Sequence, residues 1–163
     1  MATLRERILA RCPYDEAPGF LHRFFESLGR SETVHPDILR LSIPLASFGT
    51  SGGIVVSHDV DVALSRLDDF GIGRHRTAVA WSQVDEGLFP TFDGELTIEA
   101  QEDRGVCVLS LDGWYEPPLE VAGAAVDAVT GGRIAKATAR ELLRELRRIL
   151  ECACRLKEAA ASR

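Results

Sequence analysis

The period of the hydrophobic residues changes at about Pro118. Before this point apolar residues recur at every second position in several short segments, which is the pattern of half-buried strands. After it they recur at the spacing of an amphipathic helix, on a face formed by Leu142, Leu146, Ile149, Leu150 and Ala153. Strands with one apolar face need a cover, and this helix is the only predicted element large enough to supply it. The sequence therefore predicts an α+β fold, with a curved antiparallel sheet of about six strands packed on a long C-terminal helix.

The strand pattern appears in six segments, residues 3–12, 37–45, 54–64, 74–84, 95–101 and 105–115. Pro44 has no amide hydrogen to donate to a neighbouring strand, so the second segment is predicted to lie at an edge of the sheet or to end there. The last two segments are separated by a short polar stretch and predict a hairpin.

A short amphipathic helix is predicted to follow the first strand. Its apolar face is formed by Leu21, Phe24, Phe25 and Leu28. Pro18 and Gly19 are expected to break this helix near its start. In the C-terminal region, Gly131 and Gly132 are expected to mark either a kink or a short break between two helical pieces.

Composition excludes several classes of function. The chain has 163 residues, 45% of them hydrophobic, which predicts a single domain over residues 1–163. Its net charge of -6 argues against nucleic acid and anionic membrane as partners, since binders of phosphate cluster Lys and Arg. No window approaches the roughly 20 apolar residues of a membrane span, and residues 1–12 are too charged for a signal peptide. We therefore expect a cytoplasmic protein.

The sequence predicts neither a metal ion nor a cofactor. Its four cysteines lack the paired spacing of a zinc site and are expected to be buried free thiols; they are Cys12, Cys107, Cys152 and Cys154. His58 alternates with Asp59 and Asp61, so one ion could not readily collect all three side chains. The glycine-containing residues 51–53 join two strands and do not open a helix, so they lack the amides that cradle phosphate.

The C-terminal half also carries a set of motifs. They are Phe89-Pro90 before a turn containing Gly94, Gly113-x-Tyr115-x-Pro117-Pro118, Gly123 with Asp127, and Arg133-Ile134-Ala135 leading into the last helix. With the order of elements, they resemble the START-like (SRPBCC) superfamily of polyketide cyclases, dehydrases and lipid-transport proteins. That superfamily usually has a glycine soon after the two prolines, where this chain has Glu120. The resemblance implies a helix-grip fold with a cavity between sheet and helix, and no shared catalytic residue.

Several side chains are candidates for a site in such a cavity. His58 lies in an apolar alternation, where it is either a proton shuttle near neutral pH or a core histidine with a hydrogen-bond partner. Trp81 and Tyr115 suit a pocket wall, or else plain core or surface. Arg76 and Asp112 could together hold a carboxylate or carbonyl oxygen at the cavity mouth, or else are solvated surface charges. The expected ligand-binding residues are Val56, His58, Val60, Arg76, Trp81, Leu109, Leu111, Tyr115, Leu142 and Leu146.

The expected function is binding of a hydrophobic small molecule, such as a lipid, a polyketide or an aromatic metabolite, between the sheet and the C-terminal helix. One alternative is an enzyme of the polyketide cyclase or aromatase kind, with His58 as proton shuttle and Arg76 or Tyr115 orienting an oxygen. A second alternative is a chaperone-cofactor or regulatory interaction domain, which predicts an exposed apolar patch. A homodimer is left open.

Overall fold

The computed structural model describes residues 1–28, 38–44, 57–64, 68–69, 74–83, 90–116 and 124–162. Within them the elements in chain order are β1 (Ala2–Ala10), α1 (Ala17–Leu28), β2 (Ile38–Pro44), β3 (Ser57–Leu64), β4 (Asp68–Asp69), β5 (Arg74–Gln83), β6 (Thr91–Ala100), β7 (Cys107–Glu116) and α2 (Ala124–Ala161). The fold is α+β, as the change of hydrophobic period predicts.

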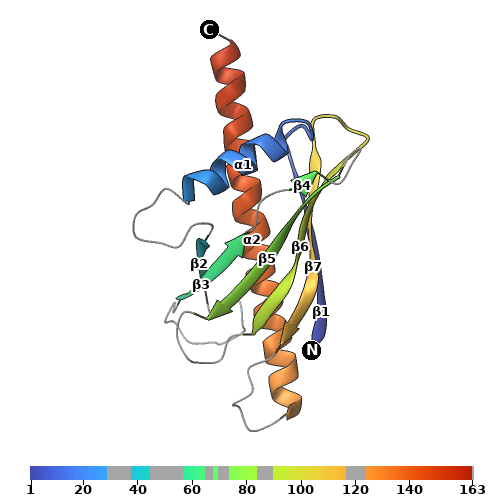
Figure 1. Ribbon diagram of the computed structural model, residues 1–163, viewed down its shortest axis with the longest axis vertical. Coiled ribbons are helices and arrows are strands. Elements are labelled where there is room, and N and C mark those ends of the chain that lie inside the picture. The colour runs from blue at the N-terminus through green and yellow to red at the C-terminus, as the bar shows by residue number, and fades with distance from the viewer. Residues whose placement is uncertain are drawn as a thin grey trace.

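The strands form one antiparallel sheet in the order β1-β7-β6-β5-β3-β2, with the short β4 paired to β5. The sheet curves along α2, which crosses its whole length and extends beyond it at both ends (Figure 1). α1 packs on α2 near one end of the sheet. β2 is the last strand on one side and ends at Pro44, which confirms the predicted edge position. The predicted arrangement of a curved sheet on a long C-terminal helix is confirmed.

The core lies between the sheet and α2. Every second residue of the central strands is buried on this inner face, as the period of two requires. The helix contributes apolar side chains at helical spacing, Leu142, Leu143, Leu146 and Leu150. Each such buried side chain contributes about 1.5–3 kcal/mol relative to an exposed one, so this contact holds the long helix in place.

Polar contacts at the margin of the core join β1 to α2. Glu6 is the one charged residue in the apolar alternation of β1, and its carboxylate accepts a hydrogen bond from Arg140 Nε at 3.1 Å. The amide of Arg11 donates to Glu151 Oε1, also at 3.1 Å. These partly exposed contacts add less than about 1 kcal/mol each, but they set the position of the helix relative to the first strand.

The predicted break in the first helix is wrong. α1 runs without interruption from Ala17, and Pro18 and Gly19 lie in its first turn. Proline is tolerated there because an amide in the first turn has no partner within the helix. The amide of Ala17 donates to Pro13 O at 3.0 Å, which closes the turn that leads into the helix.

The C-terminal region is also one helix, so a break at Gly131 and Gly132 is wrong. Gly132 has a packing role. A Cβ placed on it would lie 2.8 Å from Tyr115 Oη, which is closer than real contacts allow. Glycine lowers helix propensity, but here it leaves room for the tyrosine ring at the end of β7.

Candidate functional site

Three aromatic residues lie side by side on the inner face of the sheet. Trp81 of β5 is paired with Phe92 of β6, and Phe92 is paired with Tyr115 of β7. Trp81 and Phe92 are each 3% exposed, and Tyr115 is half-buried against the core. We call these three residues the aromatic row. It lies next to Gly132 of α2, at the end of the sheet away from α1.

The aromatic row is tightly packed. The rings of Trp81 and Phe92 are stacked, with centroids 4.0 Å apart and planes 13° from parallel. Phe92 also covers Gly94 and Gly113, which are paired on β6 and β7. A Cβ on either glycine would lie 2.6 Å from Phe92 Cζ. The absence of side chains at this pair therefore makes the space that the phenylalanine ring occupies.

The family resemblance implied a turn at Gly94, and this expectation is wrong. Gly94 lies inside β6, opposite Gly113. A Cβ on Gly94 would lie 2.3 Å from Asp112 O and 2.8 Å from Gly113 Cα, so the two strands approach each other too closely for any side chain here. For the same reason the predicted strand at residues 95–101 was too short, and Phe92 was missed as a site residue. The signal was present, because Phe92 shares the alternation of Leu96 and Ile98.

The indole N–H of Trp81 has no hydrogen-bond acceptor among the residues that the structure describes, although the atom is fully buried. A buried donor left without a partner costs about 1–3 kcal/mol. Most buried polar groups in folded proteins have a partner, which includes water and ligands. This nitrogen is therefore the point in the aromatic row where a polar atom from outside the chain would be stabilised.

The other apolar residues of the predicted site lie deeper in the core. Leu109, Leu111, Leu142 and Leu146 are all 0% exposed, and Val60 is 2% exposed. A side chain that lines an open cavity keeps some accessible surface, and these leucines keep none. They form the closed part of the core beside the aromatic row.

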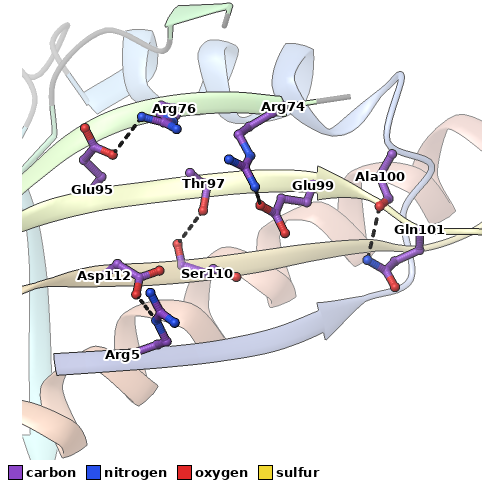
Figure 2. Close-up of polar contacts among 10 residues, drawn as sticks. All are labelled: Arg5, Arg74, Arg76, Glu95, Thr97, Glu99, Ala100, Gln101, Ser110 and Asp112. Atoms are coloured by element: carbon purple, nitrogen blue, oxygen red, sulfur yellow. Dashed lines mark hydrogen bonds and ion pairs between the residues drawn. The ribbon is translucent and has the colours of Figure 1, made fainter. Parts of the chain in front are cut away.

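Arg76 and Asp112 do not meet at the mouth of a helix-side cavity. Both side chains lie on the outer face of the sheet, and each has its own partner (Figure 2). Arg76 Nη1 contacts Glu95 Oε2 at 3.4 Å, and Asp112 accepts a hydrogen bond from Arg5 Nε. The physical reason is strand alternation. Thr77 is buried on the inner face of β5, so its neighbour Arg76 points to the outer face. Arg76 therefore does not line the space that Trp81 and Tyr115 face.

The structure does not describe the side chains of two predicted site residues. Val56 lies outside the described residues. His58 is placed by its backbone only, opposite Ile43 on β2, and its side chain is not among those described. The role of His58 as a proton shuttle stays a prediction.

Three of the four cysteines are buried, which confirms that part of the expectation; Cys152 is exposed, so for this residue the expectation is wrong. Residues two apart on a helix point in different directions, which separates Cys152 from the buried Cys154. Burial raises the pKa of the Cys12 thiol, which also contacts the Cys154 thiol. Burial raises the pKa of Cys107 to about 11 and raises that of Cys154 as well. All three are therefore protonated and poorly nucleophilic near neutral pH.

Thiol titration of the folded protein is expected to detect one fast-reacting cysteine, Cys152, because it is the exposed one. Addition of a denaturant should make all four cysteine thiols reactive. The measurement is the reaction with an aromatic disulfide reagent near neutral pH, and Cys152→Ser should remove the fast phase. A fast phase that survives this substitution would contradict the burial of the other thiols.

Over the described part of the chain, no three His, Cys, Asp or Glu side chains come close enough together to hold a metal ion. Neither of the described helices combines the length and the apolar character needed to cross a bilayer.

Three solved structures of very different sequence are similar to this chain over most of its length. A START superfamily protein from Mycobacterium smegmatis matches with a TM-score of 0.49 and 15% identity, covering 90% of this chain and 98% of the other. A conserved protein from Geobacillus kaustophilus matches with a TM-score of 0.45 and 12% identity, covering 89% and 95%. DynU16, from the dynemicin biosynthetic locus, matches with a TM-score of 0.42 and 15% identity, covering 93% of this chain and 48% of the other. No family model and no curated protein matches the sequence.

Proposed function

We propose that the protein binds a hydrophobic small molecule, such as a lipid, a polyketide or an aromatic metabolite, between the sheet and α2. The ligand lies against the aromatic row, and the Trp81 indole N–H donates a hydrogen bond to one of its oxygen atoms. The closed core of Leu109, Leu111, Leu142 and Leu146 lies beyond the aromatic row and limits how far the ligand enters.

The buried, unpartnered N–H of Trp81 carries this proposal. An apolar pocket with a small number of placed polar groups is the usual form of a small-molecule site. Here the stacked rings of Trp81 and Phe92 supply a flat apolar surface, and the indole nitrogen supplies one donor. This combination favours a ligand that is mostly apolar and carries a carbonyl, hydroxyl or carboxylate oxygen.

Tyr115 marks the side from which the ligand enters. It is the half-buried member of the aromatic row, whereas Trp81 and Phe92 are almost fully buried. Ile134 of α2, next to the region that Tyr115 contacts, is 8% exposed, while Leu142 and Leu146 further along the helix are fully buried.

The first test is extraction of natively purified protein with organic solvent, followed by mass spectrometry. We expect a bound apolar compound that carries at least one oxygen. In parallel, 1-anilinonaphthalene-8-sulfonate serves as a fluorescent probe of the pocket, and fatty acids and aromatic polyketides are tested for its displacement. If nothing is extracted, and neither the probe nor any compound binds the folded protein, the proposal is wrong.

Trp81→Phe is expected to weaken probe binding about fivefold to tenfold, because it keeps an aromatic ring and removes one hydrogen-bond donor worth about 1 kcal/mol. The chain offers a matched control, since its second tryptophan, Trp114, is 55% exposed. Trp114→Phe should leave the affinity for the probe unchanged. Equal effects of the two substitutions would contradict a specific role for the Trp81 N–H.

A further inference from the structure

The outer face of the sheet carries an exposed tryptophan. Trp114 points outward from β7, as Asp112 does two residues earlier, and is 55% exposed. Its neighbour Tyr115 faces the core. Trp114 lies between Thr3 of β1 and Asp93 of β6, which are its partners in the sheet register. Large exposed aromatic side chains are enriched at sites of protein binding.

Two surface depressions border Trp114. One has a volume of about 780 Å³ and is lined by Thr3, Leu4, Arg5, Ala78, Asp93, Gly94, Glu95, Asp112, Gly113 and Trp114. The other has a volume of about 500 Å³ and is lined by Met1, Thr91, Phe92, Asp93, Trp114 and Glu116. Asp93 and Trp114 belong to both, so they form the ridge between them. We call the two depressions together the Trp114 groove.

The Trp114 groove is acidic. Its lining side chains include four carboxylates and one guanidinium, and Met1, which carries the α-amino group, also lines it, so the formal charge is -2. Glu95 pairs with Arg76, and Asp112 pairs with Arg5 (Figure 2). Within the described residues, the carboxylates of Asp93 and Glu116 have no ion-pair partner. Asp93 lies opposite Trp114 across the sheet, and Glu116 lies two residues further along the same strand.

We propose that the Trp114 groove docks a basic segment of a partner protein. A lysine or arginine of that segment lies over the indole of Trp114, with Asp93 and Glu116 on either side. A cation over the face of a tryptophan is stabilised by the ring quadrupole, and a neighbouring carboxylate adds a charge interaction. An apolar residue of the same segment enters the larger depression, which Ala78 and the glycine pair line.

The negative charge of the groove favours a basic protein segment over a second copy of this chain, a nucleic acid or an anionic lipid. In a symmetric dimer the same patch faces itself, so a second copy would bring two groups of carboxylates together. Nucleic acid and anionic lipid carry the same sign of charge as Asp93 and Glu116, which disfavours them at Trp114 itself. A small cation alone would remain largely in water on this open sheet face, whereas small-molecule sites bury most of their ligand. An extended segment of a protein can cover both depressions.

The experiment measures fluorescence anisotropy of a labelled heptapeptide of alternating lysine and leucine. We expect the wild-type protein to bind it, with an affinity that falls as salt rises, and to bind the matched glutamate and leucine peptide at least about tenfold more weakly. Trp114→Ala and Asp93→Lys should each weaken binding of the basic peptide about tenfold or more. Asp93→Asn should have a smaller effect in the same direction.

Glu102→Lys is the matched control, because it makes the same change of net charge at an exposed position in the turn between β6 and β7, away from the groove. It should leave peptide binding unchanged, and circular dichroism should show all variants folded. Failure of the wild type to bind the basic peptide overturns the proposal, as does equal binding of the acidic peptide or an equal loss on Glu102→Lys. Self-association in sedimentation that Trp114→Ala abolishes also overturns it, in favour of a second copy as the occupant.

Discussion

Gly113→Ala is expected to lower the free energy of unfolding by about 3 kcal/mol, the upper part of the range for overpacking a buried site. The added Cβ would lie 2.4 Å from Asp93 O, 2.7 Å from Gly94 Cα and 2.6 Å from Phe92 Cζ. Two of these atoms are backbone, so rotation of a side chain cannot relieve the clash. The neighbouring strands would have to separate where β6 and β7 are hydrogen-bonded. Chemical denaturation followed by far-UV circular dichroism measures the change.

Gly19→Ala is the control for this prediction. The same substitution in the first turn of α1 places a Cβ 3.9 Å from Arg23 Nη1, its nearest neighbour apart from the adjoining backbone of the helix. Since alanine has a higher helix propensity than glycine, we expect the free energy of unfolding to rise by about 0.5–1 kcal/mol. Opposite signs for one chemical change would show that contacts decide the outcome. A loss at Gly113 no larger than at an ordinary surface site would contradict the close approach of the two strands.

Phe92→Ala is expected to lower the free energy of unfolding by about 3–5 kcal/mol, the usual cost of removing a buried phenylalanine ring. The ring is 3% exposed, stacks on Trp81 and covers the glycine pair, so its loss leaves a cavity at the centre of the aromatic row. Denaturation measures the loss of stability. Near-UV circular dichroism should also change, because the environment of Trp81 changes with it.

Combining Phe92→Ala with Gly113→Ala separates the two causes of strain. Without the ring, one of the three close contacts of the new Cβ disappears, but the two backbone contacts remain. The cost of Gly113→Ala should therefore fall by at least about 0.5 kcal/mol in the Phe92→Ala background, the lower end of the coupling between residues in contact, without reaching zero. If the two costs add without any coupling, the phenylalanine ring does not occupy the space over the glycines.

Much of the fold was predictable because the signals that define it are local. Alternation along residues 109–115 separates Leu109, Leu111 and Tyr115 from Trp114, and in the structure the first three lie on the inner face of β7 and Trp114 on the outer face. Helical spacing placed Leu142 and Leu146 in the core. A strand has a period of two and a helix has a period of 3.6, so each residue's face follows from its neighbours in the chain.

The site was only partly predictable. Asp93-Gly94 has the composition of a turn, and local sequence does not distinguish a turn from a strand position where a second backbone passes close by. Phe92 was missed for this reason. Arg76 was expected to meet a ligand, but its partner is Glu95 on the neighbouring strand, and the sequence does not state which residues are paired across a sheet.

The sequence by itself determined the class of fold, the inward and outward faces of its strands and the helix that covers them, because hydrophobic period is a property of consecutive residues. Only the tertiary structure decided that Gly94 faces Gly113, that Phe92 fills the space above them, and that Gly132 lies against Tyr115. These contacts join residues of different elements, through sheet register and helix packing. They place a buried indole donor on the inner face of the sheet and an exposed indole among carboxylates on the outer face.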